Sequence, residues 1–280
     1  MEFNSKKFEA IRFALLFSET MYLADSGKEI DQASVVKDLG IHMSQDLLFD
    51  HHIRIVANKG KRLSGWILRT FRTRKPEIML TLLKQLIHPT VEYNSVLWNP
   101  TDPILIDLLE SIQNNFLKCI NSPTLGPNSD YWDRLAHFKL YSLQRRRERY
   151  MIIYTWKVIH DLYPNPGLHL NTTTDDHSAQ PNQGISMSIN NSEEIIVSHG
   201  PAAPDWLADK SILQACCDLY NSLPRALRNT LKPEEKPCLA TFKRLLDEWL
   251  VKIPDRPTAS RRPKVAQSNS IMHQKEYIRR

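Results

Sequence analysis

Hydrophobic positions repeat with different periods along this chain of 280 residues. Between residues 8 and 43 the apolar residues fall in short runs typical of strands, and Asp25-Ser26-Gly27 predicts a hairpin turn between two of them. From residue 46 to 162 the spacing follows the helical period, and a second helical stretch covers about residues 204–253. The pattern predicts a mainly α fold with a small N-terminal antiparallel β element, a helical bundle and a second small helical segment.

The longest predicted helix covers residues 49–72. Its apolar stripe is spaced alternately by four and three residues and consists of Phe49, Ile53, Val56, Gly60, Leu63, Ile67 and Thr70. Pro76 predicts the first turn of a helix that should end at His88-Pro89, because proline disrupts a helix interior. Asp102 and Pro103 are a predicted N-cap and first position of a later helix, and another helix is predicted to begin near Ser142.

Changes in composition divide the chain into segments. Residues 1–45 are expected to be β-rich and residues 46–165 to form a helical domain. Residues 166–203 are polar and rich in turn residues, which predicts a linker with a weak hairpin between residues 185–189 and 195–197. A helical segment is expected over residues 204–254, and a basic disordered tail over residues 255–280.

The net charge of +6 is unevenly distributed. Residues 51–76 hold eight Lys or Arg and no acid, and residues 252–280 hold eight basic and two acidic residues, so the rest of the chain is acidic overall. Opposite the apolar stripe of the first helix, and just after that helix, lie Arg54, Lys61, Arg62, Arg69, Arg72, Arg74 and Lys75. Like charges on one helix face repel one another, so this face is either simply solvated or binds a polyanion.

A second basic cluster, Arg145-Arg146-Arg147-Glu148-Arg149, opens the helix that follows Ser142. Three aromatic residues come shortly afterwards, namely Tyr150, Tyr154 and Trp156. Aromatic rings beside arginines can stack on nucleic-acid bases, and the alternative is that these rings belong to the core. Arg145, Arg146 and Arg149 are therefore candidate phosphate contacts in support of the first basic block.

No motif for catalysis or for cofactor binding occurs in the chain. The sequence has no GxGxxG, P-loop, GxSxG or HExxH pattern, and its four cysteines fit no zinc spacing. His42 and His51-His52 have no Cys or Asp at ligand spacing, and Asp175-Asp176 lies in a polar stretch with no strand to orient it. The sequence therefore predicts no catalytic residue, no metal and no cofactor.

Two observations bear on location. No segment approaches the length of apolar sequence that spans a bilayer, and the N-terminus has no apolar secretion signal. The cysteines are predicted to be free thiols, which is typical of a reducing compartment. The chain is expected to be intracellular, in the nucleus or the cytoplasm, with no membrane partner.

Several motifs resemble the region that follows the catalytic motif in reverse transcriptases of non-LTR (LINE-type, jockey-like) retrotransposons. They are Lys37-Asp38-Leu39-Gly40-Ile41, His52-Ile53, Gly65-Trp66-Ile67-Leu68-Arg69-Thr70-Phe71, His88-Pro89, Glu92-Tyr93-Asn94-Ser95, Leu97-Trp98-Asn99-Pro100, Glu110 with Gln113 and Phe116, Tyr131-Trp132-Asp133-Arg134-Leu135, Leu143-Gln144-Arg145-Arg146-Arg147-Glu148-Arg149-Tyr150, Asn221-Ser222-Leu223-Pro224-Arg225-Ala226-Leu227-Arg228-Asn229 and Phe242-Lys243-Arg244. They follow the family's order over about residues 1–257.

The resemblance implies that residues 1–45 are the last strands of a polymerase palm. Residues 46–163 would be the thumb, which clamps the template–primer duplex. Leu39 and Gly40 would lie in the primer-grip turn, and Lys7 where the family places a lysine near the incoming nucleotide. The catalytic Phe/Tyr-x-Asp-Asp motif would lie upstream of Met1, so this chain alone is expected to be inactive as a polymerase.

Three hypotheses for function follow. In the first, the chain is a fragment of an RNA-directed DNA polymerase that binds the backbone of an RNA/DNA duplex without regard to sequence, and it associates with the missing catalytic half or with itself. In the second, it is a host-retained helical module that binds another protein through apolar segments such as residues 8–17. In the third, it is a relic without function.

Overall fold

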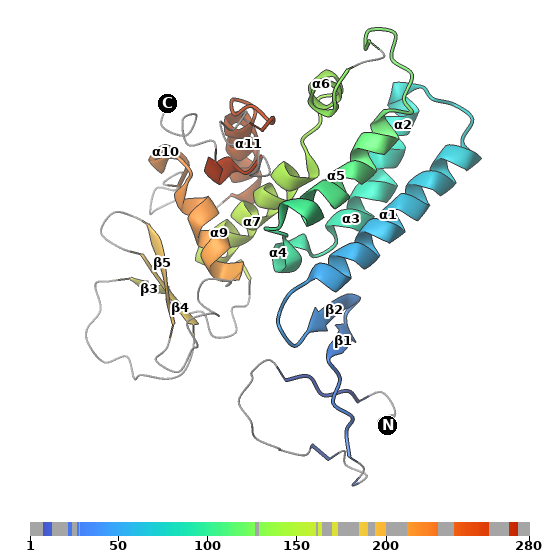
Figure 1. Cartoon of the computed structure of the whole chain (residues 1–280). Coiled ribbons are helices and arrows are strands. Elements are labelled where there is room, and N and C mark those ends of the chain that lie inside the picture. The colour runs from blue at the N-terminus through green and yellow to red at the C-terminus, as the bar shows by residue number, and fades with distance from the viewer. Residues whose placement is uncertain are drawn as a thin grey trace. The chain divides into compact units, whose positions relative to one another are not determined.

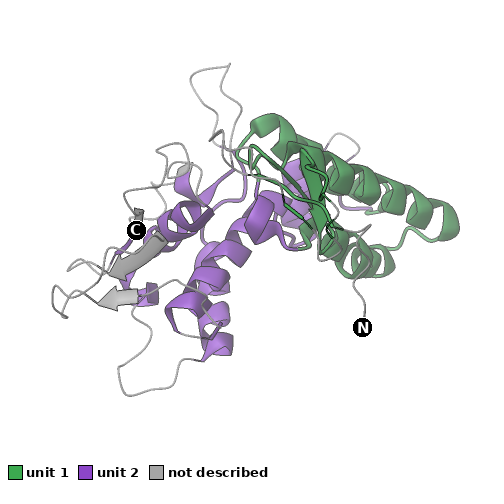
Figure 2. Ribbon diagram, turned by 90° about the horizontal axis from the view of Figure 1, so that it is seen from below, with its two compact units in different colours: residues 1–93, 100–122 green, residues 94–99, 123–280 purple. Residues whose placement is uncertain are grey.

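The computed structural model describes residues 8–12, 22–23, 27, 29–126, 129–160, 162–163, 170–172, 185–189, 194–199, 212–228, 238–257 and 269–273. The protein is mainly helical with a two-stranded antiparallel sheet near the N-terminus, which confirms the predicted fold class (Figure 1). The chain forms two compact units (Figure 2). Unit 1 comprises residues 1–93 and 100–122, and unit 2 comprises residues 94–99 and 123–280.

Unit 1 contains a hairpin followed by helices. The hairpin is formed by β1 (Val35–Asp38) and β2 (Ile41–Ser44), with Val35 opposite Ser44 and Asp38 opposite Ile41. The helical elements are α1 (Asp50–Thr70), α2 (Pro76–Leu82), the π-helical turn η2 (Leu83–Ile87), α3 (His88–Glu92) and α5 (Pro103–Leu117). Upstream, an antiparallel bridge between Leu23 and Glu29 flanks the predicted Asp25-Ser26-Gly27 turn.

The predicted apolar stripe packs α1 against the rest of unit 1. Ile53, Val56 and Ile67 are buried, and α1 contacts both α3 and α5. Gly60 sits at the closest approach, because a Cβ built on it would lie 2.6 Å from Val91 Cγ1 and 3.1 Å from Ile112 Cδ1. The buried stripe ends at Ile67, because Thr70, its last predicted member, is exposed. The buried stripe leaves the opposite side of α1 facing solvent.

The predicted helix end at His88-Pro89 is wrong. The chain passes through η2 directly into α3 and remains helical as far as Glu92. In η2 the hydrogen bonds span five residues, as in the bond from the His88 N–H to the Leu83 carbonyl. The wider π-helical turn adapts the backbone around Pro89, which has no N–H to donate.

Unit 2 is built around α7 (Leu143–Ile159). The other elements are α4 (Ser95–Trp98), α6 (Tyr131–His137), α9 (Ile212–Asn221), α10 (Arg225–Arg228), α11 (Leu239–Leu250) and the 3₁₀ turn η3 (Ile271–His273). The core joins α7, α9 and α11, and within it Trp156 stacks on Phe242 with ring centroids 4.9 Å apart. Residues 123–163 thus pack with the C-terminal helices, so the helical range 46–165 is divided between the two units.

A small sheet also belongs to unit 2. Strands β4 (Ile185–Ile189) and β5 (Ile195–His199) form the predicted antiparallel hairpin, which is therefore confirmed. Strand β3 (Leu170–Thr172) adds to β4 in parallel, and this pairing was not predicted.

The predicted cap at Asp102 and the predicted helix start near Ser142 are confirmed. The Ile104 N–H donates to the Asp102 carboxylate at 2.9 Å, and Pro103 occupies the first turn of α5. The Arg145 N–H donates to Ser142 Oγ at 3.1 Å at the start of α7. Asp130 and Asp133 form a reciprocal capping box on α6.

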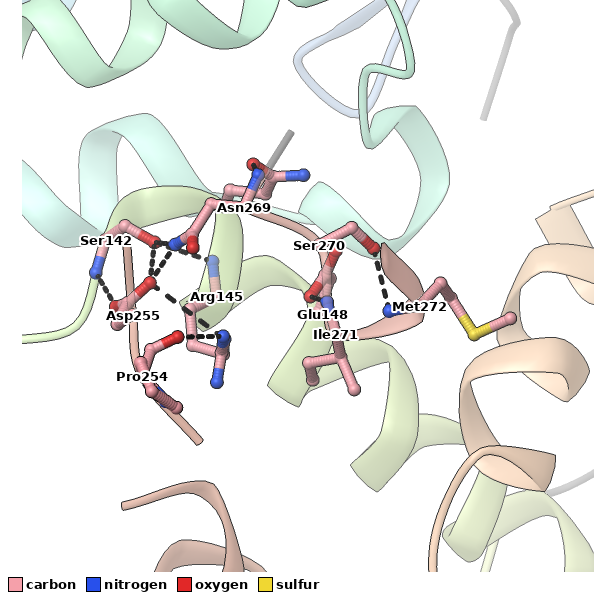
Figure 3. Close-up of polar contacts among 10 residues, drawn as sticks. Ser142, Arg145, Glu148, Pro254, Asp255, Asn269, Ser270, Ile271 and Met272 are labelled. Atoms are coloured by element: carbon pink, nitrogen blue, oxygen red, sulfur yellow. Dashed lines mark hydrogen bonds and ion pairs between the residues drawn. The ribbon is translucent and has the colours of Figure 1, made fainter. Parts of the chain in front are cut away.

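The prediction that residues 255–280 are disordered is wrong for residues 255–257 and 269–273. Ile271 is fully buried in the core of unit 2, and its N–H donates to Glu148 Oε2 at 2.9 Å (Figure 3). The Asn269 N–H donates to Gln144 Oε1 at 3.2 Å. The low apolar content of the tail gave no sign that Ile271 is a core residue. It also gave no sign that side chains of α7 accept hydrogen bonds from the backbone of the tail.

Gly60→Ala is expected to lower the free energy of unfolding by about 1–3 kcal/mol, because the new Cβ would overlap Val91 and Ile112. Ala otherwise stabilises a helix interior by about 1 kcal/mol relative to Gly. A loss of stability in urea denaturation would therefore be due to packing. Unchanged or increased stability would contradict the close approach at Gly60.

Candidate nucleic-acid interface

The outer face of α1 carries Arg54, Lys61, Arg62 and Arg69, all exposed, and a fifth exposed cation of this helix, Lys59, lies at its side. We call the first four residues the α1 basic face. The sole acid within α1 is Asp50, at its first position. In the part of the chain that the structure describes, none of the four side chains forms an ion pair. The described fold therefore pairs none of these four charges with an acid, and Asp50 lies one helical turn before Arg54.

The α1 basic face is extended along the helix. Arg54 and Arg69 are fifteen positions apart, which corresponds to about 22 Å of helix length. Between them lies a shallow open hollow, whose described lining is Ile55, Asn58, Lys61 and Arg62. A rigid row of cations of this length can meet several successive phosphates of one strand.

Sequence reasoning missed the half-exposed Trp66. Its side chain is 50% exposed, and it follows Arg62 by four residues and precedes Arg69 by three. Residues at these spacings are surface neighbours on a helix. The signal was present in the sequence, since Trp66 falls outside the apolar stripe.

Three further predicted contacts follow α1. Arg72 and Lys75 are exposed, whereas Arg74 is half-buried. The Arg74 guanidinium donates to the carbonyls of Leu68 at 2.7 Å and Thr73 at 3.0 Å, and also to that of Phe71. These bonds satisfy backbone groups at the end of α1, so Arg74 supports the helix and is left out of the interface.

The second basic cluster lies largely in the interior of unit 2. Arg145 is fully buried, with Nε 4.0 Å from Asp255 Oδ1 and Nη2 donating to the Pro254 carbonyl at 3.2 Å (Figure 3). Arg147 is also fully buried and donates from Nε to Asn99 Oδ1 at 2.9 Å. Because its guanidinium does not reach the surface, Arg145 is excluded from the set of candidate phosphate contacts.

The other members of this cluster are engaged within unit 2. Arg149 donates from Nε and Nη2 to the two oxygens of Asp247, at 2.6 and 2.8 Å. Arg146 donates from Nη2 to the Tyr150 hydroxyl at 3.1 Å. Trp156 is 1% exposed, so its ring belongs to the core and is not accessible for stacking on a base.

The remaining predicted site residues lie elsewhere. Leu39 and Gly40 form the turn of the β1–β2 hairpin with φ of 45° and 89°, and the Tyr93 hydroxyl donates to the Leu39 carbonyl at 3.2 Å. Lys7 and Asp175-Asp176 lie outside the described residues, as do residues 13–17 of the apolar segment 8–17.

Many motif residues of the resemblance serve the framework. His88 Nε2 and Gln113 Oε1 are 2.7 Å apart in the interior of unit 1, where Glu92 and Glu110 are also buried. In unit 2, Trp98 is 1% exposed and the neighbouring Asn99 holds Arg147. These residues thus specify packing, whereas Arg69, which also belongs to a motif of the resemblance, lies on the α1 basic face.

Three histidines meet where β2 joins α1. The ring centroids of His42 lie 5.6 Å from His51 and 5.9 Å from His52, and the His42 backbone N–H donates to His52 Nδ1 at 3.3 Å. Burial, followed by the neighbouring His42 and His51, lowers the pKa of His52 to about 4. Among the described residues, no group of three His, Cys, Asp or Glu side chains is arranged to hold a metal ion.

No family model matches this chain, and no solved structure matches it. It is similar to a Caenorhabditis elegans protein, "Uncharacterized protein B0403.1". The two are 30% identical over 112 residues, which are 40% of this chain and 57% of that protein, so the match spans little more than half of the relative's length.

None of the described helices combines the length and the apolar character needed to cross a membrane.

The stability of the protein is expected to fall as the pH drops from 6.5 toward 4. Unfolded His52 binds a proton near its ordinary pKa of 6.5, whereas folded His52 binds one only near 4. Between these values the unfolded state holds more protons, so acid favours unfolding. The contribution of neutral His52 to the stability of the folded state is complete only above pH 6.5. Urea denaturation at several pH values measures the slope, which His52→Gln should reduce. An equally steep slope in His52→Gln would contradict the assignment.

Asp255→Ala is expected to lower the free energy of unfolding by about 3 kcal/mol, because it leaves the buried Arg145 without its carboxylate and uncouples Ser142 from residue 255. Glu248→Ala is the matched control, since Glu248 pairs with Arg244 at the surface and such pairs contribute about 0.5 kcal/mol. Thermal or urea denaturation compares the two variants. Equal effects would show that the Arg145 site is not a buried ion pair.

Proposed function

We propose that the α1 basic face binds the phosphate backbone of nucleic acid without regard to sequence. The observation that carries the proposal is a face of about four helical turns that presents Arg54, Lys61, Arg62 and Arg69, none of which forms an ion pair among the described residues. Such a face repels itself in isolation and is stabilised when a polyanion displaces its counterions. Arg72 and Lys75, exposed beyond the end of α1, extend the same positive surface.

The resemblance to non-LTR reverse transcriptases supports the same proposal. In that family the corresponding helices would belong to the thumb, and the duplex of template and primer would lie against them. We therefore propose that the chain derives from an RNA-directed DNA polymerase and contributes duplex binding.

The α1 basic face is favoured over the second basic cluster as the binding surface. The guanidinium of Arg145 is buried and that of Arg149 is held by two oxygens of Asp247. Recruiting either of them to a phosphate would require breaking contacts within unit 2. The α1 cations need no such rearrangement.

The affinity for a blunt RNA/DNA duplex is expected to fall steeply with salt. About six phosphate contacts predict a slope of log K against log salt of roughly −4 to −5. Arg62→Gln with Arg69→Gln removes two contacts, so it should weaken binding and make the slope shallower by about two. Fluorescence anisotropy with two duplexes of unrelated sequence measures both quantities.

The matched control for this double variant is Lys84→Gln with Lys118→Gln, because both lysines are exposed in unit 1 and neither belongs to α1. It should leave affinity and slope close to those of the wild type. No binding by the wild type, a flat salt dependence, or equal losses in the two double variants would refute the proposed function.

A further inference from the structure

We infer that the α1 basic face selects nucleic acid with an unpaired segment, in which one base stacks on Trp66 while the sugar–phosphate backbone passes over Gly65. This inference rests on the proposed function and adds the class of nucleic acid to it. Two residues carry it: Trp66, which is half-exposed, and Gly65, where a Cβ would meet only Arg69 Nη1.

Trp66 has an unusual position for its residue type. It is 50% exposed, whereas Trp98 and Trp156 are each 1% exposed. The core side of α1 is already filled by residues such as Ile53, Val56 and Ile67. The indole instead lies within one helical turn of Arg62 and Arg69, which suits an aromatic platform beside phosphate-binding cations.

Gly65 is unfavourable for the helix and is not explained by packing. Glycine inside a helix is destabilising relative to alanine, yet Gly65 lies in the second half of a helix of 21 residues. A Cβ at Gly65 would meet only Arg69 Nη1, at 3.8 Å, which is an ordinary contact. Gly60 differs, because its Cβ would overlap Val91.

The position of Gly65 suggests what its missing side chain provides. Lys61, Arg62 and Arg69 are its neighbours three and four residues away, so Gly65 lies at the centre of the α1 basic face. An absent side chain at this point lowers the surface locally. A strand held by the surrounding cations can then approach the helix backbone closely.

The charge of the face decides which kind of partner fits. An apolar protein partner would bury several guanidinium groups without counter-charges, which is strongly unfavourable. An acidic peptide would satisfy the cations but would leave the exposed indole without a π-system to stack on. A nucleic-acid strand supplies regularly spaced anions and, where its bases are unpaired, flat rings accessible to Trp66.

The first test measures the affinity of the full chain for three probes: a single strand, a duplex with a single-stranded overhang, and a blunt duplex. The wild type should bind the first two at least about five-fold more tightly than Trp66→Leu does, because stacking on an aromatic ring is lost. On the blunt duplex, the two proteins should differ by less than about two-fold. Trp66→Phe keeps an aromatic ring and should retain most of the affinity.

Ile104→Ala is the control for loss of an exposed apolar side chain, because Ile104 is 69% exposed in unit 1 and lies outside α1. It should bind all three probes as the wild type does. Equal effects of Trp66→Leu on all probes, or no effect on any, would overturn the inference. So would sedimentation showing that Trp66→Leu dissociates a dimer of the wild type.

The second test uses Gly65→Ala. This change should raise the melting temperature through helix propensity and, at the same time, weaken binding of the single strand several-fold. Gly126→Ala is the matched control, because Gly126 is an exposed glycine with no atom within 4 Å of a built Cβ. A stabilised Gly65→Ala protein with unchanged affinity would overturn the role assigned to Gly65.

The outcomes separate this inference from the proposed function. If the wild type binds no nucleic acid, the proposed function fails and the inference fails with it. If the wild type binds duplex with the expected salt dependence but Trp66→Leu and Gly65→Ala bind every probe equally well, the inference alone fails.

Discussion

The close packing of α1 through Gly60 is the constraint on which the basic face depends. With a Cβ of Gly60 excluded by Val91 and Ile112, α1 lies directly against the helices of unit 1 along its apolar stripe. This packing fixes the rotation of α1 about its own axis, and the opposite side then carries Arg54, Lys61, Arg62 and Arg69 into solvent. A rigid helix holds the Cα atoms of these residues in one row, so binding orders side chains but not the backbone. The features that stabilise the fold and those proposed to bind are thus two sides of the same helix.

Unit 2 uses its arginines in the opposite way. Arg145 and Arg147 are buried, and their contacts come from Asp255, Pro254 and Asn99, which are distant in the sequence. Close to them, Ser142 caps α7 and also donates a hydrogen bond to Asp255 (Figure 3). The Glu148 carboxyl accepts a hydrogen bond from the Ile271 N–H, and burial raises the pKa of this carboxyl. Buried charges of this kind demand complete pairing, so they specify one arrangement of the chain rather than a binding surface.

Local signals in the sequence predicted a large part of this fold. The four–three spacing predicted α1, and short-range chemistry predicted the cap at Asp102 and the helix start near Ser142, because these signals depend only on neighbouring residues. Predictions that depend on distant contacts were less successful. Pro89 was read as a helix end, but η2 adapts the backbone around it. Arg145 was read as a surface cation, but its partners lie more than a hundred residues away.

For the candidate site, the basic positions on α1 were predicted to face solvent. Trp66 was assigned no role, and Arg74, predicted as a phosphate contact, instead caps the end of the helix.

Lysine footprinting tests the central claim most directly, because it locates the contact surface without altering the protein. Exposed lysines are acetylated with and without a saturating nucleic acid, and mass spectrometry compares the extent of modification at each site. Our account predicts that Lys61 and Lys75 become protected, while Lys84 and Lys118, which are exposed in the same unit but outside the proposed interface, remain equally reactive. Protection of Lys84 and Lys118 with Lys61 still reactive, or uniform modification despite saturation, would contradict the assignment of the interface to α1.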